Sequence, residues 1–211
     1  MSDPVIDQVV TELSPAAQLY VGCTIQAISP EVQDLTETRF EDCRFVASSL
    51  RNARLTQTRF DDCRFVDCDL MGTDWTQVDW PAFVMGDPPM FIGCRLDYAN
   101  FHGVKLLHGV FYGCSMIETD LRQTILRGAD LRHADLTRAE LTAADLRNAD
   151  LSGAEGYLLD PRETRVTGAI LSMPGAAGVL EALGLQLAAP PARMDSGQRA
   201  EQPTLRDRPY G

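Results

Sequence analysis

The chain has 211 residues, of which 30 are acidic and 19 basic, and its formal net charge at pH 7 is −11. This acidic composition disfavours non-specific binding to nucleic acid or to an acidic membrane face. No stretch approaches the ~18 consecutive apolar residues of a membrane-spanning helix, and the first residues lack the basic and apolar regions of a signal peptide. We therefore expect a cytoplasmic protein whose partners include no nucleic acid and no membrane.

Residues 1–19 are predicted to form an N-terminal capping segment. Asp3 and Pro4 are typical of a helix start, and the apolar residues that follow are spaced as in a short amphipathic helix: Val5, Ile6, Val9, Val10 and Leu13. Such a helix would cover the first coil of the repeat region that follows, since an exposed terminal coil offers unpaired backbone groups to other chains.

Residues 20–171 are governed by a period of five. Between Val32 and Leu151 a large apolar residue, usually Leu or Phe, recurs every fifth position, and a small residue stands two positions before it. This period fits neither a helix nor a strand, so both positions can face one interior only if the chain turns a corner in every unit. Four such units, with four corners, close one square coil. In agreement, residues 36–46 recur four units later as residues 56–66 with nine of eleven positions identical.

The cysteines all occupy the small inward position of this repeat: Cys23, Cys43, Cys63, Cys68, Cys94 and Cys114. We expect them to be reduced, buried and used as small apolar side chains. The three histidines, His102, His108 and His133, follow the large position and are expected to point outward, where they cannot share a metal with inward thiols. We predict no metal and no cofactor.

The repeat changes phase between Trp80 and Phe91, where the spacing is one residue longer than the two whole units that would keep the register. The intervening residues 81–90 contain three prolines, which remove donors from a ladder of backbone hydrogen bonds. This segment is predicted to be a bulge, a kink or a protruding loop. One interpretation is a tolerated insertion of one residue, and the other is a site where a partner docks.

Residues 172–187 are predicted to form a C-terminal helix followed by a short strand. Pro174 suits the first turn, Val179, Leu180 and Leu183 form a narrow apolar face, and Gly184 is typical of a C-terminal cap. Leu185–Leu187 is the expected strand. Residues 188–211 are rich in Pro, Arg, Gln and Gly with little to bury, and we interpret them as a disordered tail.

The repeat unit itself has the pattern Ala-(Asp/Asn)-Leu-X-X, as in residues 129–133 and 149–153, and resembles that of the pentapeptide-repeat family. The resemblance implies an all-β fold, a right-handed quadrilateral β-helix, here with short N- and C-terminal capping or dimerisation helices. The ending 169–187 is similar to that of gyrase-protecting members, in which this element pairs two chains. It implies a homodimer through Val179, Leu180, Leu183, Leu185 and Leu187, the alternative being a simple cap.

An enzyme is disfavoured, because a filled square coil has flat faces and the sequence offers no nucleophile with a base, no phosphate loop and no ligand cluster. The acids are concentrated near the phase change, and the candidate partner-binding residues are Asp61, Asp62, Asp67, Asp69, Asp74, Asp79, Asp87 and Asp97. The segment 71–81 and the C-terminal helix resemble albicidin- and microcin-resistance proteins, and the chain is also similar to Qnr-type quinolone-resistance proteins. The resemblance implies a DNA mimic that binds DNA gyrase or topoisomerase IV and protects it from poisons. The alternative is a protein-interaction rod with no topoisomerase role.

Overall fold

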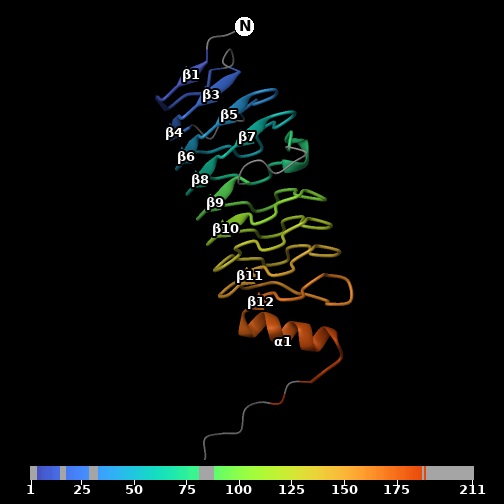
Figure 1. The fold of residues 1–211 in the computed structure, drawn as a ribbon. Helices are drawn as coiled ribbons and strands as arrows, with labels where there is room; N and C mark the ends of the chain where they lie inside the picture. The colour runs from blue at the N-terminus through green and yellow to red at the C-terminus, as the bar shows by residue number, and fades with distance from the viewer. Residues whose placement is uncertain (1–3, 15–17, 29–32, 81–87, 187, 189–211) are drawn as a thin grey trace, which may run out of the picture.

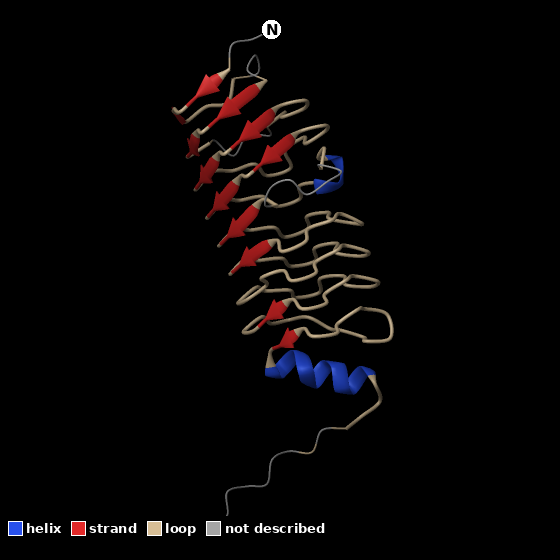
Figure 2. Ribbon diagram, in the orientation of Figure 1, coloured by secondary structure: helices blue, strands red, loops and turns tan. Residues whose placement is uncertain are grey.

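The computed structural model describes residues 4–14, 18–28, 33–80, 88–186 and 188, which form a parallel β-solenoid ending in a helix (Figure 1). Two neighbouring faces of the rod carry its strands, which Figure 2 shows gathered along one side. Face 1 holds a four-stranded sheet, β1 (Val5–Ile6), β3 (Leu19–Val21), β5 (Arg39–Glu41) and β7 (Arg59–Asp61). Face 2 holds β2 (Val9–Val10), β4 (Thr24–Gln26), β6 (Arg44–Val46), β8 (Arg64–Val66), β9 (Met90–Ile92) and β10 (Val110–Tyr112), and further on β11 (Asp150–Leu151) with β12 (Ile170–Leu171).

On the other two faces, successive coils are joined by single parallel β-bridges. On face 3, Ser49 pairs with Asp69, and Asp69 pairs with Arg95. On face 4, Asn100 pairs with Asp120, which pairs in turn with Glu140. With few exceptions the two partners are separated by four repeat units, as a four-sided coil requires. The all-β, four-sided solenoid predicted from the period of five is confirmed.

The interior is a continuous column of the large residues of the repeat. Aromatic rings stack from coil to coil: Phe45 lies on Phe65 with 4.5 Å between ring centroids, and Phe65 lies on Phe91 at 5.2 Å. The small position is also inward, and all six cysteines are buried and unpaired, as predicted. Their thiols lie within hydrogen-bond distance of backbone carbonyls, for example Cys63 Sγ of the Phe40 carbonyl oxygen at 3.5 Å.

Residues at the corners adopt the left-handed backbone conformation. Asp42, Asp62 and Asp67 have φ angles of 50°, 52° and 52°. Asp and Asn tolerate this region better than most side chains because they can form local hydrogen bonds, and glycine has no Cβ to clash. The corner between faces 1 and 2 therefore carries Asp42 and Asp62, and the corner between faces 2 and 3 carries Asp67.

The expected N-terminal helix is wrong, because β1 and β2 extend the solenoid to Val5. Val5 pairs with Tyr20 and Val10 pairs with Ile25, so the first coil begins inside the segment that was predicted to cap it. A short helix is marginal in isolation, whereas β-branched residues are favoured in strands and here gain ladder hydrogen bonds. The five-residue spacing of Val5 and Val10 was the signal for this coil.

The phase change is larger than the sequence indicated. Phe91 lies directly over Phe65, so the coil between them contains six residues more than a regular coil of four units. An insertion of six and a slip of one are indistinguishable in a pattern of period five, which is why only one extra residue was predicted. Residues 81–87, where the bulge, kink or loop was expected, lie outside the described residues.

The C-terminal helix is α1 (Met173–Ala182), with Ser172 as its N-cap and Pro174 in its first turn. Gly184 follows the helix with a φ of 80°, as expected of a capping glycine. Residues 185 and 186 form no strand, and Leu187 and residues 189–211 lie outside the described part of the chain. Figure 1 shows α1 lying across the end of the solenoid.

Candidate partner-binding surfaces

The structure distributes the candidate acids over several sides of the rod instead of gathering them on one. By position they are Asp61 and Asp79 on face 1, Asp62 at the corner of faces 1 and 2, Asp67 at the corner of faces 2 and 3, Asp69 and Asp97 on face 3, and Asp74 on face 4. Asp87 lies outside the described residues. No single flat partner surface can contact all of these positions at once.

On face 1 the acids are interleaved with arginines. Arg39 Nε lies 2.7 Å from a Glu41 carboxylate oxygen and 3.3 Å from one of Asp61. Arg59 Nε lies 3.9 Å from Asp61 and 3.6 Å from Asp79. These side chains are partly exposed, so each pair contributes little to stability, but together they neutralise much of the charge of this part of face 1.

Many acids of the repeat have a structural role that the sequence reasoning missed. The Asp74 carboxylate accepts hydrogen bonds from the Thr76 backbone N–H at 3.1 Å and from its hydroxyl at 2.6 Å, and caps the 3₁₀ helix η1 (Trp75–Gln77). Asp69 accepts in the same way from the Met71 N–H at 3.2 Å. The same contact to the residue two positions later recurs at Asp34, Asp120, Asp130, Asp135, Asp145, Asp150 and Asp160. An Asp at this position stabilises the turn, so its presence does not by itself indicate a partner.

Asp97 is a buried structural residue, and the expectation that it meets a partner is wrong. Its carboxylate accepts hydrogen bonds from the Ser115 hydroxyl at 2.5 Å, from Arg95 Nε at 2.8 Å and from the Ile117 N–H at 3.1 Å, and only 4% of the residue is exposed. Burial by itself raises the pKa of Asp97, but the hydrogen bonds from Arg95, Ser115 and Ile117 outweigh it and hold this pKa below its ordinary value.

The acids of the C-terminal half are more often paired with a following arginine. Arg122 binds Asp120 through two nitrogens at 3.0 and 2.7 Å, and Arg132 binds Asp130 at 2.8 and 2.7 Å. The hydrogen bonds from these arginines lower the pKa values of both aspartates. In the N-terminal half, by contrast, Asp42 and Asp67 are exposed corner residues that form no ion pair with any described residue.

A second candidate surface is apolar and lies at the C-terminal end. Its exposed residues are Leu158, Ile170, Met173, Leu183 and Leu185. Of the residues predicted at a dimer interface, Leu183 and Leu185 belong to this group, while Val179 packs partly against the core and Leu180 is half-buried. Leu187 lies outside the described residues. Leu158, which is 80% exposed, and Met173, which is 84% exposed, were not predicted, because they fall outside the periodic pattern.

Helix α1 is held against the last coil by specific contacts. The Tyr157 hydroxyl lies 3.0 Å from the Ser172 hydroxyl and accepts a hydrogen bond from the Ser172 N–H. Arg162 donates to the Ala182 carbonyl oxygen at 2.8 Å. Gly175 passes so close to the Tyr157 ring that a Cβ there would overlap the Tyr157 hydroxyl. The helix therefore has a defined position on the coil.

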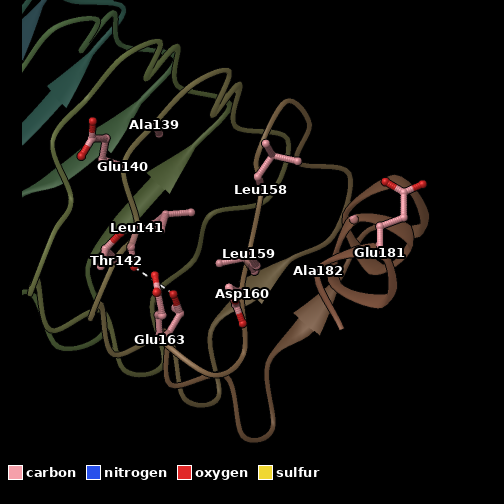
Figure 3. Close-up of a pocket in the computed structure, with 12 residues that line it drawn as sticks. Ala139, Glu140, Leu141, Thr142, Leu158, Leu159, Asp160, Glu163, Glu181 and Ala182 are labelled. Carbon is pink, nitrogen blue, oxygen red and sulfur yellow. Dashed lines mark hydrogen bonds between the residues drawn. The ribbon is translucent and has the colours of Figure 1, made fainter. Parts of the chain in front are cut away.

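A groove of about 470 Å³ lies between the helix and the last coils (Figure 3). Leu141, Leu158 and Leu159 supply apolar surface, and four carboxylates line the same groove: Glu140, Asp160, Glu163 and Glu181. Asp160 is bound by Arg162, which lowers the pKa of Asp160 to about 2. Within the described ranges, no group of three or more His, Cys, Asp or Glu residues is placed to hold a metal ion. The described helices include none long and apolar enough to cross a membrane.

Comparison with protein families identifies the repeat. A family model described as pentapeptide repeats matches eight copies, over residues 34–77 and 114–153. These two ranges lie on either side of residues 81–90, where the repeat changes phase. No curated protein matches the sequence.

Solved structures share the fold. A trypsin-treated variant of QnrB1, a plasmid-mediated fluoroquinolone resistance protein, is 18% identical and superposes with a TM-score of 0.59, covering 88% of this chain and 97% of that one. A second trypsin-treated QnrB1 variant, also 18% identical, gives 0.51 with 90% and 100% coverage. A pentapeptide repeat protein of the Arabidopsis thaliana thylakoid lumen is 29% identical over 48% of this chain and 59% of that one, with a TM-score of 0.20. At 18% identity the likeness to the two QnrB1 variants concerns the fold alone.

Proposed function

Because the chain belongs to the pentapeptide-repeat family, we propose that it acts as an acidic rod that binds a type II topoisomerase, DNA gyrase or topoisomerase IV, and protects the enzyme from a poison. The rod would occupy the basic surface that otherwise holds DNA. The observation that carries the proposal is the set of exposed corner carboxylates in the N-terminal half, above all Asp42 and Asp67, which no arginine neutralises among the described residues. The fold that the chain shares with a fluoroquinolone resistance protein adds support.

The charge density limits what kind of mimic this is. B-DNA presents one negative charge per ~1.7 Å of its axis. Consecutive coils are ~4.8 Å apart, and acids occur in successive coils at the corner of Asp42 and Asp62, whereas Asp67 has Ala47 and Gly93 at the same corner of the neighbouring coils. The rod therefore reproduces the sign and position of a few phosphates and not their full density. Binding through these charges should weaken as salt rises, but less steeply than the binding of duplex DNA, because the salt dependence grows with the number of charge contacts.

A supercoiling assay tests the proposal. Gyrase is inhibited by a fluoroquinolone, and this protein is added in increasing amounts, with the expected result that supercoiling recovers. The triple substitution Asp42→Asn, Asp67→Asn and Asp79→Asn should abolish that recovery, because it removes three exposed carboxylates that form at most a weak ion pair, that of Asp79 with Arg59 at 3.6 Å. Asp97 is not used, since its loss would damage the fold.

The matched control changes the net charge equally at the other end of the rod, through Glu118→Gln, Glu140→Gln and Glu155→Gln. This variant should protect as well as the wild type does. Equal protection by all three proteins would remove Asp42, Asp67 and Asp79 from the mechanism. If the wild type affects neither gyrase nor topoisomerase IV, the topoisomerase role itself is refuted.

A second candidate function is a protein-interaction rod with no topoisomerase role. The turn-stabilising contacts of the repeat aspartates favour it, because they account for much of the acidic composition without a basic partner. The supercoiling assay separates the two functions. The interaction-rod alternative predicts no protection by any variant.

We also propose that two chains pair through the C-terminal end. Met173 at the start of α1, and Leu183 and Leu185 beyond its end, are exposed apolar residues that a helix serving only as a cap would not need. Light scattering should give the mass of a dimer for the wild type and of a monomer for Leu183→Asp. A wild-type monomer at micromolar concentration would leave α1 as a cap alone.

A further inference from the structure

Face 1 changes its sign of charge along the rod. In the N-terminal half it carries Glu41, Asp61 and Asp79 among its arginines. In the C-terminal half its outward residues include four cations and one acid: Lys105, Arg127, Arg147, Arg165 and Asp145. We call these four cations the basic patch. In a chain with a net charge of −11, this concentration of positive charge is a local exception.

The solenoid geometry brings the basic patch together. Parallel bridges join Lys105 to Ile125, Ile125 to Asp145 and Asp145 to Arg165, so three successive coil steps separate the first cation from the last. At ~4.8 Å per step the patch is about 14 Å long. Arg127 and Arg147 directly follow the buried Leu126 and Leu146 in the sequence. They form a second outward column on face 1, in which the two arginines are one coil step apart. The four cations therefore cover both outward columns of one face.

Much of this positive charge is not neutralised within the described part of the chain. The buried carboxylate of Asp145 is bound by Arg147 and also lies 3.9 Å from Arg165. Lys105 and Arg127 are exposed and form no ion pair with any described residue, although the charge of Arg127 also helps to lower the pKa of Asp145. The net charge of the patch with Asp145 is thus +3.

The corners beside the basic patch are almost uncharged, which leaves it open to a partner. Towards face 2 they are His108, Gly128, Asn148 and Gly168, and towards face 4 they are Gly103, Gln123, Ala143 and Glu163. Glu163 is the one acid in these two rows. Since outward residues of faces 2 and 4 in the same coils include Asp130, Asp150, Asp120 and Glu140, the positive surface ends at the corners.

We propose that the basic patch binds an acidic segment of a partner protein, independently of the acidic corners used in the proposed function. The magnitudes favour a short peptide over a nucleic acid. An extended chain rises ~3.4 Å per residue, so about four residues span the 14 Å patch and supply up to four carboxylates against a net charge of +3. Duplex DNA would bring about eight charges over the same length, and its continuation along face 1 would meet Glu41, Asp61 and Asp79.

The test measures fluorescence anisotropy of a labelled glutamate decamer with the full-length protein at low ionic strength. The wild type should bind the decamer, and added salt should weaken that binding. Lys105→Gln with Arg127→Gln should weaken it about fivefold or more, the equivalent of ~1 kcal/mol from two exposed charge contacts. Because neither side chain has an ion pair to lose, the double variant should fold normally.

The matched control is Arg54→Gln with Arg138→Gln, which removes two cations that are 73% and 70% exposed on other sides of the rod. This variant should bind the decamer as the wild type does. Absence of wild-type binding, or equal loss in both variants, would overturn the proposal. Tighter binding of a labelled ten-base-pair DNA than of the decamer would also overturn the proposal. So would a salt-sensitive dimer that the double variant Lys105→Gln with Arg127→Gln dissociates, because the partner of the patch would then be a second copy of the chain.

Discussion

Replacing Asp97 with alanine should destabilise the protein more than any substitution at an exposed acid of the rod. The carboxylate accepts from two donors of the next coil, the Ser115 hydroxyl at 2.5 Å and the Ile117 N–H at 3.1 Å, and both contacts are partly buried. A buried donor left without an acceptor costs about 1–3 kcal/mol, so the two together should lower the free energy of unfolding by about 4 kcal/mol. Arg95 contributes little to this loss, since half of its side chain is exposed.

Urea denaturation followed by circular dichroism measures the effect, with Asp42→Asn as the control. Asp42 is exposed and forms no ion pair with any described residue, and its substitution should change the free energy of unfolding by no more than about 0.5 kcal/mol. A loss below about 1 kcal/mol for Asp97→Ala would refute the reasoning. It would mean that solvent reaches the two donors after all.

The same carboxylate should make stability depend on pH in a defined direction. The pKa of Asp97 is lower in the folded state than its ordinary value of about 3.9, so its stabilising contribution is fully present above that value. It is lost as pH falls from about 3.9 through the lower folded-state pKa. The difference in unfolding free energy between wild type and Asp97→Ala should therefore be constant near neutral pH and shrink in this acidic range. A difference that stays constant down to pH ~2 would contradict the assignment.

Three further predictions concern packing. Phe65→Ala should lower the free energy of unfolding by about 3–5 kcal/mol in urea denaturation, because the fully buried ring stacks on both neighbouring coils; a loss below about 1 kcal/mol would place it outside the column. Gly175→Ala should loosen α1 from Tyr157, with faster amide exchange in residues 173–182 and little change in the coils, and unchanged exchange would contradict the close contact. Cys43 and Cys63 should react slowly with an alkylating reagent in the native protein, as mass spectrometry would show, and rapid labelling would contradict their burial.

The acidic composition has two sources that only the folded chain separates. In many coils an Asp accepts a hydrogen bond from the backbone N–H two positions later and so stabilises the turn, as Asp74 and Asp69 do. A corner acid such as Asp67 makes no ion pair with any described residue and is therefore the better candidate for a partner. Counting acids along the sequence mixes the two groups, and for that reason it selected the buried Asp97 beside exposed residues.

The period of five determined the fold without any tertiary information. A chain that must bury both Phe45 and Cys43, and then Leu50 and Ser48 one unit later, has to turn a corner in every unit. The near repeat of the sequence after four units specifies four corners per coil. The same reasoning placed the thiols inside. Helix α1 was also predictable, because Pro174 and Gly184 mark its ends by the backbone angles they favour.

The tertiary structure decided what a pattern of period five cannot distinguish. It showed that the phase change is an insertion of six residues, which a pattern of period five cannot distinguish from an insertion of one. It also placed Val5 and Val10 in strands, because pairing with Tyr20 and Ile25 supplies hydrogen bonds between coils that an isolated helix lacks. It also sorted the charges. Lys105 and Arg165 are distant in the sequence but share a column three coil steps long, so which charges act together is set by the stacking of the coils and not by distance along the chain.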